Sequence, residues 1–98
     1  MGSPAARVGD MHVCMRVDPI AKAHVGGPIL PPGEMTVLIG GRPAARIGDR
    51  AFCIGPPDTI TGGSNTVIIG GKGAARAGDG TAHGGKIASG EATVLIGD

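Results

Sequence analysis

Pro4-Ala5-Ala6-Arg7-Val8-Gly9-Asp10 is the stretch that decides the fold, because the chain repeats it twice more. The second copy is Pro43-Ala44-Ala45-Arg46-Ile47-Gly48-Asp49, and the third is Gly73-Ala74-Ala75-Arg76-Ala77-Gly78-Asp79. A chain that repeats itself at this scale is built from copies of one supersecondary unit. We therefore expect three related units.

A second phrase ends each unit and has the pattern of a β-strand followed by a glycine turn. Its three copies are Thr36-Val37-Leu38-Ile39-Gly40-Gly41, Thr66-Val67-Ile68-Ile69-Gly70-Gly71 and Thr93-Val94-Leu95-Ile96-Gly97-Asp98. Closely spaced prolines between Asp18 and Gly33 exclude a helix there. Each unit thus reads as a strand out, a loop and a strand back, with Glu34 to Ile39 as the first returning strand.

Two-stranded units are marginal in water, so the three should share one core. We predict an all-β fold: a small cone of three β-hairpin repeats with pseudo-threefold symmetry, in which rows of Val, Leu and Ile meet in the middle. One domain should cover residues 1–98, with repeat units at approximately 4–41, 43–71 and 73–98.

Composition excludes several functions and shows what the fold lacks. The formal net charge is +1 and no run of Lys or Arg occurs, which argues against nucleic-acid binding. No apolar stretch is long enough to span a membrane, and charged residues interrupt any secretory leader, so we expect synthesis and folding in the cytoplasm. Aromatic residues make up only 1% of the chain, so the small core needs an additional cross-link.

The charged residues of the repeated phrase share one recurring spacing, an Arg followed three residues later by an Asp. The pairs are Arg7 with Asp10, Arg46 with Asp49 and Arg76 with Asp79. Three matching copies are a poor arrangement for an active site. We expect these pairs to hold turns in place, either through charge-assisted hydrogen bonds or through an Asx-type turn.

Side chains able to bind a metal occupy the same position in all three units. Cys14, Cys53 and His83 each lie four residues after the Asp of the repeated phrase. His12 shares a strand face with Cys14, and His24 lies in the long loop of the first unit. Threefold symmetry would bring these residues together, and tetrahedral Zn²⁺ takes four ligands from His and Cys. The sequence therefore predicts one structural Zn²⁺ near the apex.

Five candidates compete for the four ligand positions. We expect His12, His24, Cys53 and His83 to bind the metal, with Cys14 as a small buried residue behind the site. The alternative set replaces His12 with Cys14. No catalytic residues and no other cofactor are expected.

The chain contains the tetrapeptides Pro4-Ala5-Ala6-Arg7 and Pro43-Ala44-Ala45-Arg46, with the Gly-Asp that follows and the Thr-Val-Leu-Ile-Gly returns. With these motifs, residues 2–98 resemble the PAAR-repeat family. The third copy departs from the motif, with Gly73 and Ala77. The resemblance implies a cone of β-hairpins with zinc held by three His and one Cys. Binding by all three His agrees with the first ligand set, and the resemblance leaves Cys53 or Cys14 as the fourth ligand.

The resemblance also implies a function. PAAR domains cap the trimeric VgrG spike of the bacterial type VI secretion system, so we expect a non-enzymatic tip with one chain per trimer. Such a tip would contact the target membrane transiently and recruit adaptor or effector proteins without a covalent link. It would be cytoplasmic before firing and secreted afterwards. The alternatives are a small zinc hydrolase, with three protein ligands and an open water position, and the tip of a contractile phage tail.

Overall fold

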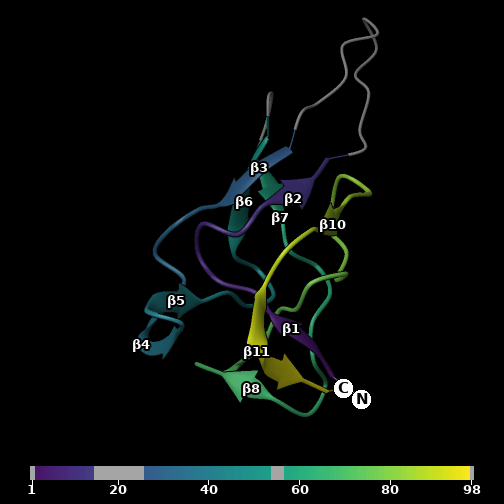
Figure 1. The fold of residues 1–98 in the computed structure, drawn as a ribbon. Helices are drawn as coiled ribbons and strands as arrows, with labels where there is room; N and C mark the ends of the chain where they lie inside the picture. The colour runs from purple at the N-terminus through teal and green to yellow at the C-terminus, as the bar shows by residue number, and fades with distance from the viewer. Residues whose placement is uncertain (1, 15–25, 54–56, 98) are drawn as a thin grey trace, which may run out of the picture.

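The fold consists of short β-strands joined by turns (Figure 1), as a computed structural model describes it for residues 2–14, 26–53 and 57–97. The strands are β1 (Ser3–Ala5), β2 (His12–Val13), β3 (Gly26–Ile29), β4 (Glu34–Ile39), β5 (Arg42–Ala44), β6 (Arg50–Cys53), β7 (Asp58–Thr59), β8 (Ile68–Ile69), β9 (Lys72–Gly73), β10 (Lys86–Ile87) and β11 (Glu91–Ile96). These ranges contain no helix, so the all-β prediction is confirmed. They accordingly offer no helix that could serve as a membrane span.

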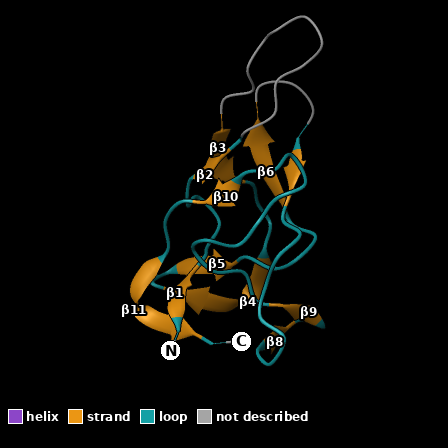
Figure 2. Cartoon of the chain, turned by 90° about the vertical axis from the view of Figure 1, so that its right-hand side faces the viewer, coloured by secondary structure: helices purple, strands orange, loops and turns teal. Residues whose placement is uncertain are grey.

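At one end of the molecule, each returning strand pairs with the start of the next repeated phrase. β4 pairs with β5, and β8 with β9, through turns whose glycines have positive φ. β11 makes the third such pair with β1, so the first and last strands of the chain lie side by side (Figure 2). The reason is local for the first two pairs: the Gly-Gly turn leads the returning strand directly into the next phrase, and the two segments pair across it.

The other end holds β2, β3, β6, β7 and β10 (Figures 1 and 2). β10 pairs with β2, and β3, β6 and β7 form a three-stranded sheet. The predicted out-and-back pairing within a single unit is seen in β6 and β7. The other pairs at this end join strands of different units, so each ligand-bearing segment is supported by a neighbouring copy. The principal extents are 39 × 25 × 23 Å, which gives an elongated body.

The repeated phrases contact one another in a closed cycle near the middle of the molecule. The backbone N–H of Ala6 donates to Ala75 O at 3.0 Å, that of Ala45 to Ala6 O at 3.0 Å, and that of Ala75 to Ala45 O at 2.9 Å. Each unit therefore donates to one neighbour and accepts from the other. The cycle agrees with three equivalent units, while the pseudo-threefold symmetry itself remains an expectation.

The core is built from layers of equivalent residues around this cycle. One cluster contains Ala6, Ala45, Ala75, Ala51, Ile29, Ile60 and Ile87, and the other contains Ala5, Ala44, Ala74, Ile39, Ile69 and Ile96. The alanines are 0–1% exposed, because the three backbones approach too closely for larger side chains. The expected Val and Leu rows do not reach the centre. Val37, Val67 and Val94 are 36–37% exposed, and Leu38, Ile68 and Leu95 are 57–61% exposed.

Replacing a core isoleucine should cost far more stability than replacing an exposed one. Ile60 is 1% exposed, whereas Ile68 is 57% exposed. We expect Ile60→Ala to lower the free energy of unfolding by about 2–5 kcal/mol, because it removes buried methyl groups and leaves a cavity. Ile68→Ala is the matched control and should change it by less than about 1 kcal/mol. Thermal denaturation measures both, and equal losses would refute this assignment of the core.

The Arg-Asp pairs close the turn after the paired alanines, as expected. Asp10 Oδ2 accepts hydrogen bonds from the backbone N–H of Arg7 at 2.8 Å and from its Nε at 3.0 Å, and Oδ1 accepts one from Nη2 at 3.0 Å. The backbone bonds from Arg46 to Asp49 and from Arg76 to Asp79 measure 2.8 and 2.7 Å. The glycine before each Asp has a φ of 93–94°, a conformation that other residues rarely adopt. Charge-assisted side-chain bonds and backbone capping by the Asp therefore occur together in these turns.

Candidate metal centre

Three short segments bring candidate ligands to one point at the end of the molecule that holds β2 and β6. His12 and Cys14 are buried and Val13 between them is 48% exposed, as strand alternation requires. Cys53 ends β6, where it pairs with Gly26 of β3. His83 lies in a turn that a hydrogen bond from Gly84 N to Thr81 O closes at 3.0 Å.

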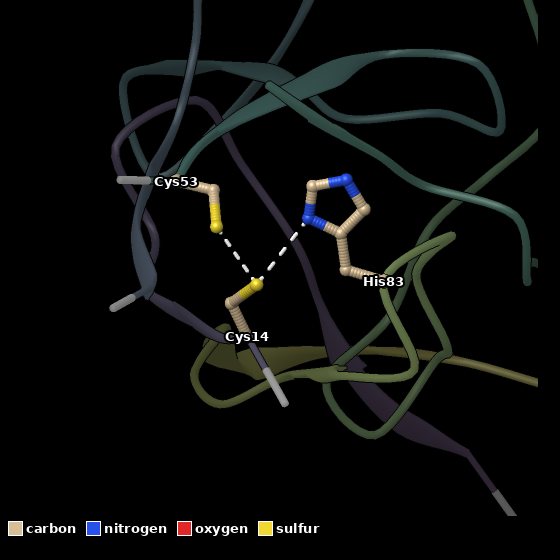
Figure 3. Close-up of side chains that lie close together, drawn as sticks. All are labelled: Cys14, Cys53 and His83. Carbon is tan, nitrogen blue, oxygen red and sulfur yellow. Dashed lines mark hydrogen bonds between the residues drawn. The ribbon is translucent and has the colours of Figure 1, made fainter. Parts of the chain in front are cut away.

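Cys14, Cys53 and His83 face one another (Figure 3). The Cys14 and Cys53 sulfurs are 2.7 Å apart, and the Cys14 sulfur lies 3.3 Å from His83 Nδ1. The ligand atoms of all three residues lie within 4.8 Å of one another. Both cysteines are buried, at 7% and 3% exposure. The equivalent positions of the three units therefore converge, as the repeat predicted, and lie close enough to hold a metal ion.

The structure does not bring His12 into this group. Its Nδ1 lies 2.8 Å from Gly27 O, and its Nε2 lies 3.1 Å from Asp58 Oδ2. Nδ1 also accepts a hydrogen bond from the backbone N–H of Gly27 at 3.4 Å, so both ring nitrogens have protein partners, and His12 is 2% exposed. His24 falls outside the described residues. Of the four expected ligands, Cys53 and His83 come together, and Cys14 from the alternative set completes the group.

Asp58 is the residue that sequence reasoning missed. The two prolines before it indicate only a turn, but it begins β7 and is 0% exposed. Its Oδ1 accepts hydrogen bonds from the backbone N–H of Thr59 at 2.8 Å and of His83 at 2.9 Å. Burial, the largest influence, raises the pKa of the Asp58 carboxyl, but hydrogen bonds from these donors and others outweigh it and leave the pKa below its ordinary value. Asp58 is therefore a buried carboxylate with defined partners.

The chemistry of the three grouped residues suits a soft or borderline divalent metal. Thiolate and imidazole ligands favour Zn²⁺ among the common metals, whereas Mg²⁺ and Ca²⁺ prefer oxygen ligands. Among the residues that the structure describes, no carboxylate belongs to the group. A structural tetrahedral site would need one further ligand. The residues present thus fit the metal that the sequence predicts.

Comparison with known proteins adds one finding. The family model of the PAAR motif matches residues 21–89, which is most of the chain. No curated protein sequence matches the chain.

Proposed function

Because the chain belongs to the PAAR-motif family, a family of structural spike tips, we propose that it caps the trimeric VgrG spike of a type VI secretion system. One chain would sit on one trimer. The observation that carries this proposal is the set of equivalent, exposed apolar side chains on β4, on β8 and the residue before it, and on β11. These strands lie at the opposite end of the molecule from β2 and β6, the strands next to the Cys/His group (Figure 2).

The exposures of these side chains match from unit to unit. Val37, Val67 and Val94 are 36%, 37% and 37% exposed, and Leu38, Ile68 and Leu95 are 61%, 57% and 61% exposed. Single exposed apolar residues are ordinary, but large ones that recur at equivalent positions on one end of a molecule mark an interaction surface. A surface with three equivalent parts suits a partner with three equivalent subunits.

Strands β4, β8 and β11 can also form backbone hydrogen bonds with a further strand. β4, β8 and β11 each belong to a two-stranded sheet, so within the described part of the chain each has one edge that pairs with no other strand. Open edges pair readily with strands of another chain. We propose that the three edges and their apolar side chains together form the contact with the three subunits.

At the opposite end, we propose that one Zn²⁺ is held by Cys14, Cys53 and His83, with His24 as the fourth ligand. This is the alternative set of the sequence analysis, and the contacts of His12 with Asp58 and Gly27 favour it. The metal would supply a cross-link among segments from different units. Such a cross-link would keep this end of the molecule intact when the tip is driven into a target membrane.

A zinc hydrolase is the less favoured alternative, because three carboxylates of the described residues that could act as a general base are bound to other protein groups. Glu34 bonds to Arg46 at 3.2 Å, Glu91 bonds to Arg7 at 3.1 Å, and Asp58 is held by its own partners. We therefore propose a non-enzymatic tip, made in the cytoplasm and released with the spike, that recruits cargo through non-covalent contacts.

Binding to the spike tests this function. The chain is mixed with the VgrG trimer encoded in the same genome, and native mass spectrometry measures the stoichiometry. We expect one chain per trimer, and we expect Leu38→Glu, Ile68→Glu and Leu95→Glu combined to abolish binding. Val13→Glu, which changes a residue 48% exposed near the Cys/His group, is the control and should bind normally. Normal binding by the triple variant would contradict the proposed docking surface.

A further inference from the structure

A buried His-Asp pair lies directly beside the Cys/His group, and neither docking nor metal ligation accounts for it. His12 is 2% exposed and Asp58 is 0% exposed. Burying two ionisable side chains costs free energy unless each polar atom has a partner. Burying such a pair costs more free energy than burying apolar side chains, so its contacts indicate a specific role.

Those contacts join all three segments that carry the grouped ligands. His12 precedes Cys14 by two residues on the β2 segment, and Asp58 Oδ2 lies 3.1 Å from its Nε2. Asp58 itself pairs with Ala51 of β6, the strand that ends at Cys53. Its Oδ1 accepts the backbone N–H of His83 at 2.9 Å. One residue thus connects the three segments without any metal: the Asp58 carboxylate contacts His12 and the His83 backbone, and its own backbone pairs with β6.

The histidine adds a fourth connection. His12 Nδ1 lies 2.8 Å from Gly27 O, which ties β2 to the first residues of β3. To act as a metal ligand, the ring would have to give up its contacts with Gly27 or its contact with Asp58, and so leave a buried polar group without its partner. The observed geometry therefore uses His12 to hold protein groups.

We infer that His12 and Asp58 are positioning residues, which hold Cys14, Cys53 and His83 in place for the metal, and that His12 is not itself a ligand. This rests on the proposed metal site. Partners behind metal ligands fix ligand orientation, and their loss typically lowers metal affinity by about 10- to 100-fold while the ligands stay in place. Here the effect would act through the His83 backbone and the β6–β7 pair.

The test uses Co²⁺ as a spectroscopic probe in the full chain. Absorption bands of bound Co²⁺ report the thiolate ligands and the tetrahedral geometry, and competition with a chromophoric chelator gives the dissociation constant. We expect His12→Ala and Asp58→Ala to bind one Co²⁺ with the wild-type spectrum but about 10- to 100-fold more weakly. Asp58→Asn keeps an oxygen that can accept from Thr59 and His83, so it should recover part of the affinity.

Two further variants separate the roles of ligand and positioning residue. Cys53→Ser removes a grouped ligand and should change the spectrum, whereas Asp49→Asn weakens a turn elsewhere and should leave metal affinity unchanged. The inference is overturned if His12→Ala changes the spectrum as Cys53→Ser does, or if neither His12→Ala nor Asp58→Ala weakens binding. If the wild-type chain itself takes up no metal, the proposed metal site fails and this inference fails with it. If an alanine variant does not fold, Asp58→Asn and His12→Gln supply the same comparison.

Discussion

Cys53→Ser is expected to abolish stoichiometric Zn²⁺ binding and to lower the melting temperature by tens of degrees. Cys53 is 3% exposed, and its sulfur lies 2.7 Å from that of Cys14 in the group of three residues. A metal that binds only the folded chain stabilises it by about 4 kcal/mol when its free concentration is about 1,000 times the dissociation constant. In a domain of this size, each kcal/mol shifts the melting temperature by about 4–8 °C.

Metal content by mass spectrometry and thermal denaturation measure this effect together. Removing the metal from the wild-type chain with a chelator should reproduce the loss, and the same chelator should have no further effect on Cys53→Ser. His83→Ala should behave like Cys53→Ser. One zinc per chain in purified Cys53→Ser, with an unchanged melting temperature, would contradict the assignment of Cys53 as a ligand.

Gly85→Ala is expected to lower the free energy of unfolding by about 3–5 kcal/mol. A Cβ atom at Gly85 would collide with Val13 O and would lie 3.1 Å from Cys14 Cα. These are backbone atoms beside the paired strands β10 and β2, so neither can move aside without breaking the pairing of Lys86 with Val13. Relief of the clash would also displace Cys14, so we expect metal binding to weaken as well.

Gly80→Ala is the matched control, because it makes the same chemical change in the same turn region. The nearest atom to a Cβ at Gly80 is Thr61 Oγ1 at 3.9 Å, and the residue does not require a positive φ. We expect a change within about 1 kcal/mol, because the new methyl group meets no clash and alanine restricts the unfolded chain. Chemical denaturation of both variants measures the difference, and equal stability of the two would refute the close approach of β10 to β2.

Much of the fold could be predicted because the sequence repeats, and equivalent positions in the repeats form equivalent structure. The returning strand from Glu34 to Ile39, the Arg-Asp turns and the convergence of Cys14, Cys53 and His83 all follow from equivalent positions in equivalent units. The location of the valines and leucines did not follow. Apolar character alone does not distinguish a side chain that fills a core from one that stays exposed at the surface, and Leu38 is 61% exposed.

The choice between His12 and Cys14 could not be made from the sequence for a related reason. His12 begins β2 and Cys14 directly follows that strand on the same face, so strand alternation buries both. What separates them is Asp58, which lies 46 residues further along the chain than His12 and meets it only after folding. An aspartate that follows two prolines in the sequence gives no local signal of that contact.

X-ray absorption spectroscopy at the zinc edge, on the chain loaded with one Zn²⁺, tests the central claim most directly. It counts sulfur and nitrogen ligands by their distances, about 2.3 Å for Zn–S and about 2.0–2.1 Å for Zn–N. We predict two sulfurs and two nitrogens, from Cys14, Cys53, His83 and His24. One sulfur with three nitrogens would contradict this account, because it would place His12 on the metal and leave one of the two cysteines unbound.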